Sequence, residues 1–530
     1  MEPVHERSRR AGGFAPTGIS QRRCNLRLDM GISQVSRGDQ QANSSNSALC
    51  EWMARQYRFS VEAMLRAVSA TDLIKERPHF GQAIRPARGS VLASPELASY
   101  DPNPDYFFHW LRDSAIIIDA LRVLIAEQTL ESNAIEHLVD FVNFSLGLCQ
   151  LDGRAFSSGK VRRAIDPSFL EHARTEDELN QIHGDRTLGE ARYNPDGTLD
   201  IIRWARPQND GPALRALSVL RSWRLEAFRE RADEAAIRAL LEHDLDYTLR
   251  HWEEPCFDLW EESFAHHYHT RVVQFAALAD GAAWMDASGD RTRAGNYRLA
   301  AEEIARRLDD HFDADEGVYV GCVADGSESS GVAVSTRLDI AVALGVIHAA
   351  RTNGAHSVLD PKALATLGRL EQLFAKEYQI NEGRGSDCAP AMGRYAGDVY
   401  YSGGAYYFST LGAAQFYFRF AEAIGGGATI PISKQNPGLL TEMLAQSSQV
   451  LDTAAVEPLS REGLFKACLH RGDMFMAMVR AYTPASGELS EQFDQTTGAQ
   501  TSAKNLAWSY AAFITAVASR KAAIRYCPPL

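Results

Sequence analysis

The sequence predicts an all-α fold, a helical barrel, and three observations lead to this prediction. Apolar residues recur near positions i, i+3, i+4 and i+7 in one segment after another, which is the period of an amphipathic helix. Alternating strand patterns are scarce, and Gly317-Val318-Tyr319-Val320 is one short candidate. No Pro- or Ser-rich linker divides the helical region. We therefore expect one large domain in which an even number of helices alternates between inner and outer positions.

Roughly a dozen segments carry this helical period. In chain order they are 52–59, 111–127, 135–151, 212–230, 233–252, 270–287, 292–312, 336–350, 361–378, 405–424, 437–451, 460–482 and 505–520. Two of the connections, 152–203 and 381–404, are long and rich in Gly, Asp, Arg and Tyr. Long loops in compact domains are usually functional or disordered. The aromatic and charged residues in these two loops favour function.

Composition limits the classes of partner. The chain has 530 residues, of which 45% are hydrophobic, so it can bury a large core. Length alone would suggest roughly three or four domains of about 150 residues, but large barrels form longer single domains. The net charge of −13 argues against DNA or an acidic membrane as a partner. No apolar run approaches the roughly 18 residues of a membrane span, so we predict a soluble monomer with no nucleic-acid and no membrane partner.

Residues 1–46 differ in composition from the rest of the chain. They are rich in Arg, Gln, Ser and Gly, and they show almost no apolar periodicity. The apolar core of a secretory signal, about 7–15 residues long, is missing from this stretch. We expect either a disordered extension or a translation start upstream of the true one, with Met30 as the alternative, followed by a helical domain over 47–530. A cytoplasmic location is expected, and a secreted or periplasmic one stays open if the true start lies elsewhere.

Two residue types raise the question of a disulfide or a metal. Eight cysteines are scattered without a C-x-x-C pair, so free thiols are expected, and one or two disulfides stay open. In the run His266-His267-Tyr268-His269, the first and last histidines could share a helix face. Metal sites need three or four convergent ligands, and no further set accompanies this run. We predict no metal and no cofactor, and a surface or rim position for the histidines.

Two acidic clusters are candidates for catalysis. Asp258, Glu261 and Glu262 lie within five positions beside Trp260, and a second cluster occupies 488–494. Charged residues are mostly exposed, so each cluster could be a solvated turn. Two carboxylates brought together from distant segments are also what glycosidic bond cleavage requires.

Loop segments rich in aromatic and charged residues lead into the predicted helices. They are 103–114, 204–212, 258–262 and 393–404, and we expect them to converge at one mouth of the barrel. In the first of them, Arg112 and Asp113 could bind a pair of sugar hydroxyls, and Tyr106 and Trp110 offer flat faces. The alternative is that Asp113-Ser114 caps a helix, because Asp and Ser accept hydrogen bonds from free backbone N–H groups there.

These segments, in this order, resemble the glucoamylases, the family 15 glycoside hydrolases. The motifs that carry the resemblance are NPDYFFHWLRDS, RWARPQNDGPALRA, DLWEES, MGRYAGDVYYSGG and LSEQFDQTTGAQTSAKNLAWSYAA. They span about residues 89 to 516, almost the whole helical region. The resemblance implies an (α/α)6 barrel, a six-hairpin toroid, with the active site in a funnel at one end.

The resemblance also implies a role for individual residues. It assigns Glu261 as general acid and Glu491 as general base, and it places Arg112, Asp113 and Arg394 around the glucose at the non-reducing end. The other substrate-binding residues that we predict are Tyr106, Trp110, Trp204, Arg206, Asp258, Trp260, Glu262, Asp398, Tyr400 and Trp508. Glu491 lies in a Gly/Ser/Thr-rich loop, so we expect it to be solvated and ionised. On a helix, Glu261 and Glu262 would point about 100° apart, so only one could reach the scissile oxygen.

The reaction implied is the release of β-glucose from the non-reducing ends of α-1,4-glucans and malto-oligosaccharides. Such an inverting enzyme holds its two carboxyl groups about 6.5–9.5 Å apart to admit a water molecule. The sequence departs from the family pattern at Ala205, at 402–406 and at His109. An enzyme acting on α-1,6 linkages or on trehalose therefore stays open. A non-catalytic glucan-binding barrel is a further alternative, because fold alone does not determine function.

Overall fold

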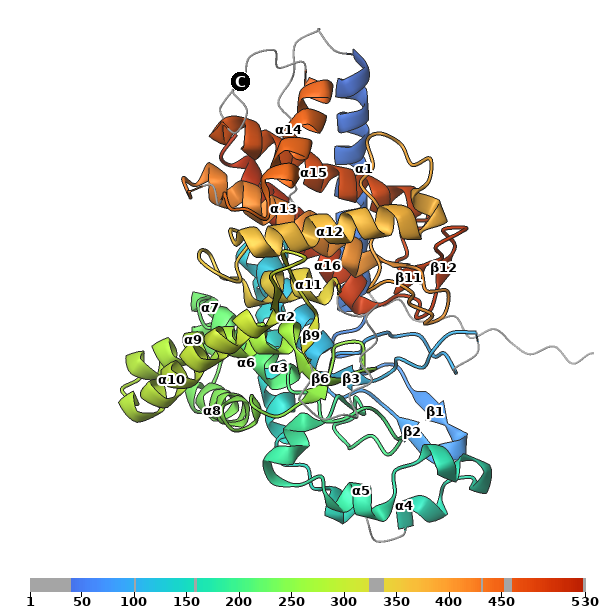
Figure 1. Ribbon diagram of the computed structural model, residues 1–530. Helices are drawn as coiled ribbons and strands as arrows, with labels where there is room; N and C mark the ends of the chain where they lie inside the picture. The colour runs from blue at the N-terminus through green and yellow to red at the C-terminus, as the bar shows by residue number, and fades with distance from the viewer. Residues whose placement is uncertain are drawn as a thin grey trace, which may run out of the picture.

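Helices dominate the computed structural model, which describes residues 40–99, 102–156, 160–323, 338–429, 432–451 and 460–527 (Figure 1). The helices are α1 (Gln40–Leu65), α2 (Leu111–Ala126), α3 (Ile135–Leu148), α4 (Lys160–Arg163), α5 (Glu176–Asn180), α6 (Gly211–Ser222), α7 (Glu226–Arg231), α8 (Glu234–His251), α9 (Tyr268–Ala287), α10 (Arg291–Leu308), α11 (Ala341–Ala349), α12 (Pro361–Glu377), α13 (Tyr407–Gly425), α14 (Pro437–Leu451), α15 (Arg461–Tyr482) and α16 (Ala507–Ile524). Residues 1–39 of the predicted extension 1–46 lie outside the described residues and stay a prediction, whereas residues 40–46 belong to α1.

Six helices close into an inner ring. In order around the ring, α2 packs on α6, α6 on α9, α9 on α11, α11 on α13, α13 on α16, and α16 on α2. An outer helix covers each of them: α3 contacts α2, α8 contacts α6, α10 contacts α9, α12 contacts α11, α15 contacts α13, and α1 contacts α16. This arrangement confirms the predicted (α/α)6 barrel.

The sequence pattern of each helix matches its place in the barrel. The inner helix α13 is buried along nearly its whole length, from Tyr407 to Ile424, as expected of a helix that is apolar on all sides. The outer helix α10 buries only one stripe, made of Ala294, Tyr297, Ala300, Ala301, Ile304 and Leu308. Residues three and four apart lie on one face, so this stripe packs on α9 while the charged face meets solvent.

Side-chain caps set the start of several outer helices. The carboxylate of Asp233 accepts from the backbone N–H of Ala235 at the start of α8, and Asp360 accepts from Lys362 at the start of α12. The Ser460 hydroxyl accepts from Gly463 at the start of α15. Each cap satisfies a backbone donor that the first helical turn leaves without a partner, which fixes where the helix begins.

Short strands join the segments that precede the inner helices. The strands are β1 (Lys75–Arg77), β2 (Gln82–Ile84), β3 (His109–Trp110), β4 (Arg192–Tyr193), β5 (Cys256–Phe257), β6 (Phe264–His267), β7 (Phe312–Asp313), β8 (Val318–Tyr319), β9 (Cys322–Val323), β10 (Ala405–Tyr406), β11 (Gln492–Phe493) and β12 (Gln500–Thr501). They pair antiparallel as β1–β2, β3–β4, β5–β6–β9, β7–β8 and β10–β11–β12. The strands β3, β6 and β10 run directly into α2, α9 and α13, so these ladders gather the loops at one end of the ring.

The predicted helices differ from the observed ones mainly at their ends. The segment 212–230 is two helices, α6 and α7, because the chain turns at 223–225 and α7 packs on α3 instead of continuing along the ring. The segment 405–424 begins as β10, since its first two residues pair with β11. The strand candidate at 317–320 is confirmed, because Val318 and Tyr319 form β8.

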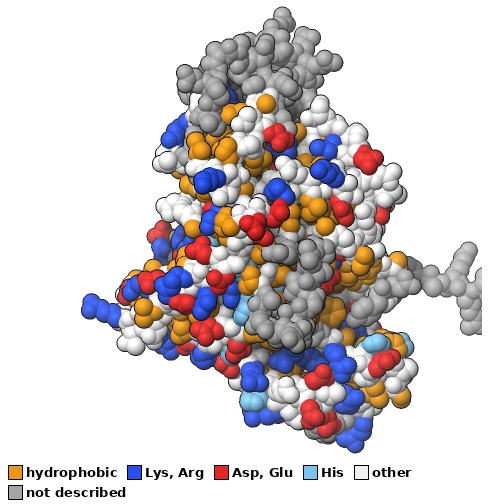
Figure 2. Space-filling view, in the orientation of Figure 1, with side chains coloured by type: hydrophobic (Ala, Val, Ile, Leu, Met, Phe, Trp, Pro, Cys, Tyr) orange, Lys and Arg blue, Asp and Glu red, His pale blue; other side chains and the backbone are white. Residues whose placement is uncertain are grey.

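The described surface carries charges of both signs (Figure 2), and the described cysteines are not paired with one another. Basic and acidic side chains are interspersed over the face shown in Figure 2. No helix within the described ranges is both long enough and apolar enough to span a bilayer. The seven cysteines that the structure describes are free thiols, and Cys24 lies outside the described residues.

Candidate active site

A cavity of about 630 Å³ opens at the end of the ring where the loops that precede the inner helices meet. It is lined by Ala93, Tyr106, Trp110, Arg112, Asp113, Arg203, Trp204, Ala205, Leu259, Trp260, Glu261, Glu262, Arg394, Tyr400, Tyr406, Phe408, Glu491, Leu506 and Trp508. All four predicted loop segments contribute to the lining, and so does the downstream acidic cluster. The structure therefore brings Glu261 and Glu491 to one cavity from positions 230 residues apart (491 − 261).

Glu261 stands on a tight turn between β5 and β6, and the turn is not helical. The Asp258 carboxylate accepts from the backbone N–H groups of Glu262 at 2.8 Å and Ser263 at 2.9 Å. Glu261 itself has a φ of +67°, in the left-handed region that residues other than glycine seldom occupy. Strained backbone of this kind persists only where its surroundings hold it in place, as the Asp258 side chain does here.

Four N–H donors fix the carboxylate of Glu261. Its Oε1 accepts from Trp110 Nε1 at 2.7 Å and Gln208 Nε2 at 2.9 Å, and Arg112 Nη2 lies at 3.4 Å. Its Oε2 accepts from Trp204 Nε1 at 2.5 Å. A carboxyl group held on both oxygens keeps one orientation toward the cavity. Gln208 is a contact that sequence reasoning missed, although it lies inside the 204–212 segment.

Glu262 points to a different set of partners. Its Oε1 accepts from Arg394 Nη2 at 2.9 Å, and its Oε2 accepts from the Tyr395 hydroxyl. The Glu262 side chain is 39% exposed, whereas that of Glu261 is 14% exposed. The two neighbouring carboxylates thus have different partners, and the more exposed one lies on the rim beside Arg394.

Glu491 is buried, which corrects the expectation that it is solvated. Only 8% of the residue is exposed, and burial raises the pKa of its carboxyl to about 7. The Ser502 hydroxyl donates to its Oε2, and the Tyr106 hydroxyl lies 3.5 Å from its Oε1. The Gly/Ser/Thr-rich composition of this loop did not keep Glu491 exposed, because part of the loop turns back on itself, where Asp494 accepts from the Thr497 backbone, and Ser502 packs against the Glu491 carboxyl.

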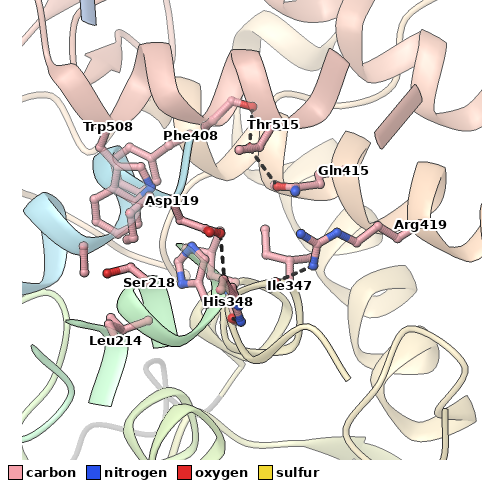
Figure 3. A pocket seen from close by; sticks show the side chains of 16 residues that line it. Asp119, Leu214, Ser218, Ile347, His348, Phe408, Gln415, Arg419, Trp508 and Thr515 are labelled. Carbon is pink, nitrogen blue, oxygen red and sulfur yellow. Dashed lines mark hydrogen bonds and ion pairs between the residues drawn. The ribbon is translucent and has the colours of Figure 1, made fainter. Parts of the chain in front are cut away.

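Aromatic side chains form the walls and the floor of the cavity. The rings of Tyr106 and Trp110 lie 5.2 Å apart, and the edge of Trp110 meets Trp204 at 6.2 Å. Phe408 and Trp508 stack at 4.2 Å with their planes 9° apart. These two rings also line a smaller cavity of about 40 Å³ within the barrel (Figure 3), so they form the floor between the two cavities.

Asp113 faces the cavity instead of capping a helix. No side chain caps the N-terminus of α2, and the Ser114 hydroxyl donates back to the Leu111 carbonyl. Burial raises the pKa of Asp113 to about 6, and its carboxylate lies 3.6 Å from Arg112 Nε. The alternative that these residues form a cap is therefore wrong.

Three of the predicted substrate-binding residues do not line the cavity. Asp258 closes the turn that carries Glu261. Asp398 accepts from Arg394 Nε at 2.7 Å from behind. Arg206 pairs with the buried carboxylate of Glu190. Each of them holds a residue or segment of the wall, because a charged group buried next to the cavity needs hydrogen bonds or a partner of opposite charge.

The structure adds residues that sequence reasoning missed. Gln208 contacts Glu261, and the wall of the cavity includes Ala93, Arg203, Leu259, Phe408 and Leu506. Tyr406 also lines the cavity and lies in the segment 402–406 that departs from the family pattern, whereas Phe408 belongs to a segment whose helical period pointed only to core packing. No signal in one sequence distinguishes a core aromatic residue from one whose ring edge reaches a cavity.

Two of the three histidines after the acidic run are buried, and the third, His266, is half-buried. His267 and His269 are 4% and 1% exposed, because β6 leads directly into the inner helix α9. His267 Nε2 donates toward the carbonyl oxygens of Cys256 and Ser263, each at 3.0 Å. Within the part of the chain that the structure describes, no group of three or more His, Cys, Asp or Glu side chains is placed to hold a metal ion.

Comparison with known proteins gives consistent matches. A family model described as glycosyl hydrolases family 15 matches residues 79–518. Glucoamylase 1 of Rhizopus oryzae is 28% identical over 488 residues, which are 89% of this chain and 71% of that protein. A glucoamylase of Blastobotrys adeninivorans is 26% identical over 462 residues, covering 82% of this chain and 68% of that protein.

Two solved structures share the fold. The glucoamylase of Saccharomycopsis fibuligera aligns with a TM-score of 0.72 at 22% identity, over 94% of this chain and 98% of that one. The family 15 glucoamylase of Hypocrea jecorina aligns with a TM-score of 0.70 at 24% identity, over 91% of this chain and 73% of that one.

Proposed function

This chain belongs to glycosyl hydrolase family 15, and on that premise we propose that it is a glucoamylase, an exo-acting hydrolase of α-glucans. One observation carries the proposal: Glu261 and Glu491, from distant segments, line a single cavity whose walls are aromatic. Paired carboxylates serve as acid and base in glycosidic cleavage, and flat aromatic rings pack against sugar rings.

In the proposed mechanism, Glu261 gives a proton to the glycosidic oxygen as the bond from C1 to that oxygen breaks. Glu491 takes a proton from a water molecule whose oxygen forms the new bond to C1. The product is β-glucose, because the water attacks the face opposite to the leaving group. Trp110, Trp204 and Gln208 support Glu261 as it becomes an anion, since each donates a hydrogen bond to it.

Arg112, Asp113 and Arg394 are proposed to bind the hydroxyls of the terminal glucose. Arg112 and Arg394 are held by buried carboxylates, Asp210 at 3.4 Å and Asp398 at 2.7 Å, so their guanidinium groups are fixed before substrate arrives. Fixed donors lose less conformational entropy on binding than mobile ones. The proposed substrate is an α-1,4-linked malto-oligosaccharide.

The test follows the anomeric proton signals by NMR while the protein acts on maltotriose, isomaltotriose and trehalose in separate samples. We expect β-glucose as the first product, with the highest rate on maltotriose. Initial α-glucose would overturn inversion, and a faster reaction with isomaltotriose or trehalose would overturn the α-1,4 assignment. Absence of glucose from all three substrates would overturn the proposed function.

A further inference from the structure

Arg192 is a buried cation directly behind the wall of the active site. It lies in β4, and in the antiparallel ladder with β3 it is paired with Trp110. The side chains of Arg192 and of its ion-pair partner Asp200 are both 0% exposed, with Nε 2.8 Å from Oδ2. Nothing in the mechanism above uses this cation.

The guanidinium group of Arg192 is stacked between aromatic rings. Its Cζ lies 3.6 Å from the centre of the Trp204 ring and 5.1 Å from that of Trp110. A third ring, Phe108, lies at 4.0 Å. Trp204 and Trp110 are the two tryptophans whose indole N–H groups hold the two oxygens of Glu261. The cation therefore packs against the two indoles, and the two indoles are hydrogen-bonded to the carboxylate, so the four groups are connected.

Two buried nitrogen atoms of Arg192 depend on the aromatic rings for a favourable interaction. Within the described residues, its Nη1 and Nη2 have no hydrogen-bond partner although both are buried. A buried donor without a partner is costly, so such an arrangement calls for a compensating interaction. Here the faces of the rings supply it, because a guanidinium group over an indole is attracted to its π electrons.

A cation over the face of an indole also changes the indole. It draws π-electron density away from the ring, which makes the N–H group a stronger hydrogen-bond donor. A stronger donor stabilises an anionic acceptor more than a neutral one. Glu261 gains negative charge as it gives up its proton, so the effect is greater in the transition state than in the bound substrate complex.

We propose that Arg192 is a positioning residue that strengthens the hold of Trp110 and Trp204 on the proton donor Glu261. This inference rests on the proposed glucoamylase activity. Arg192 lies outside the cavity, and we infer that it affects the protonation of the leaving group. The inference gives it no effect on the binding of sugar hydroxyls.

The test compares two substrates that differ in their need for a proton donor. Maltose releases a sugar oxygen that must be protonated, whereas α-glucosyl fluoride releases fluoride, a far weaker base that leaves with much less help. We expect Arg192→Met to lower kcat on maltose about tenfold with little change in KM, since cation–π interactions of this kind correspond to such a factor. On α-glucosyl fluoride the fall should be less than about threefold. Arg192→Lys, which keeps the charge, should recover part of the loss.

Arg77→Met is the matched control. The guanidinium of Arg77 stacks on Phe108 at 3.8 Å and is buried beside Asp105, and within the described residues no hydrogen bond or cation–π contact joins it to either indole. Its loss should reduce stability, as the loss of any buried cation does, and leave the ratio of the two rates unchanged. If Arg192→Met does not fold, Arg192→Lys decides the matter. The inference requires that the rate on maltose, divided by the rate on α-glucosyl fluoride, is lower in Arg192→Lys than in the unmodified protein.

The indole N–H signals of Trp110 and Trp204 give a second measurement. In Arg192→Met both should move upfield in proton–nitrogen spectra as their hydrogen bonds weaken, and in Arg77→Met both should stay. Equal losses on the two substrates, or unmoved indole signals, would overturn the inference. Inactivity of the unmodified protein on maltose would instead overturn the proposed function.

Discussion

Burial controls the ionisation of Glu491 at the level of a single residue. A general base must be ionised to accept a proton, and the pKa of this carboxyl is raised to about 7. On the proposed mechanism, the free enzyme loses its base as pH falls below about 7, and kcat/KM should decline on that acid limb. At pH values well below the pKa of Glu491, kcat/KM should fall about tenfold for each pH unit, because the ionised fraction of the base falls by that factor.

The Ser502 hydroxyl opposes this effect, because its hydrogen bond to Glu491 favours the ionised form. We predict that Ser502→Ala raises the pKa of Glu491 further and moves the acid limb of kcat/KM upward by about one pH unit, the size expected for one hydrogen bond to a charged group. The measurement is a pH–rate profile on maltotriose. An acid limb in the same place as in the unmodified protein would refute the prediction.

Removing either proposed catalytic carboxyl should abolish most of the activity. We predict that Glu261→Gln and Glu491→Gln each lower kcat by about 10²–10⁴, since general acid or base catalysis contributes that much per group. Glu488→Gln is the control, because Glu488 is an exposed carboxylate in the same acidic cluster. Steady-state rates on maltotriose measure all three, and a near-normal rate for either Glu261→Gln or Glu491→Gln would contradict the role given to that residue.

At the level of local elements, the turn at 258–263 determines where Glu261 points. Asp258 supplies one carboxylate oxygen to two backbone N–H groups, and removing it leaves both donors without that partner. We predict that Asp258→Ala lowers kcat at least tenfold, because the strained backbone of Glu261 can then relax. Asp258→Asn keeps an acceptor oxygen at the same place and should stay within about threefold of the unmodified rate. Equal rates for the two variants would show that the turn does not depend on this contact.

The C-terminus of α11 depends on arginines from two other helices. Arg419 of α13 donates to the carbonyl of Ile347, and Arg221 of α6 donates to those of His348 at 2.6 Å and Ala349 at 3.3 Å. Figure 3 shows Arg419 reaching toward Ile347 beside His348 and Asp119. Cations stabilise the negative end of a helix dipole, so these contacts hold α11 within the inner ring.

We predict that Arg419→Leu lowers the free energy of unfolding by about 1–3 kcal/mol, because the last carbonyl groups of α11 lose a charged donor. The kcat of this variant should change less than about twofold. Arg419 lines the smaller cavity of about 40 Å³, and the rings of Phe408 and Trp508 separate that cavity from the active site. Arg306→Leu, at a side chain that is 66% exposed, is the control and should stay within about 0.5 kcal/mol. Denaturant unfolding measures both, and equal losses in the two variants would contradict the prediction.

On the scale of the whole molecule, the closed ring of inner helices confines the site to one end. The cavity reaches down to Phe408 and Trp508 and ends there, so a sugar chain can enter only by a free end. We predict no release of glucose from β-cyclodextrin, which has no chain end, under conditions where maltoheptaose is consumed. Product analysis by chromatography measures this, and hydrolysis of the cyclic substrate would exclude an exo-acting site.

The sequence allowed more of the fold to be predicted than of the site. Every predicted helical segment overlaps at least one observed helix, because the 3.6-residue period records burial on one side of a local element. The two-residue strands β3, β4, β10 and β11 were missed, since two positions give too short a pattern unless a longer strand-like run surrounds them, as 317–320 surrounds β8. For the same reason, the pairing of Trp110 with Arg192 between β3 and β4 could not be predicted from the sequence.

The sequence by itself determined the helical class, the order of the loops and the two carboxyl groups, Glu261 and Glu491. Only the tertiary structure decided that Glu491 is buried, that Asp258 and Asp398 hold the wall instead of lining it, and that Arg192 lies behind Trp204. The reason is physical. Helical periodicity is local, whereas the solvation of a charge depends on every group packed around it, and here those groups come from segments hundreds of residues apart.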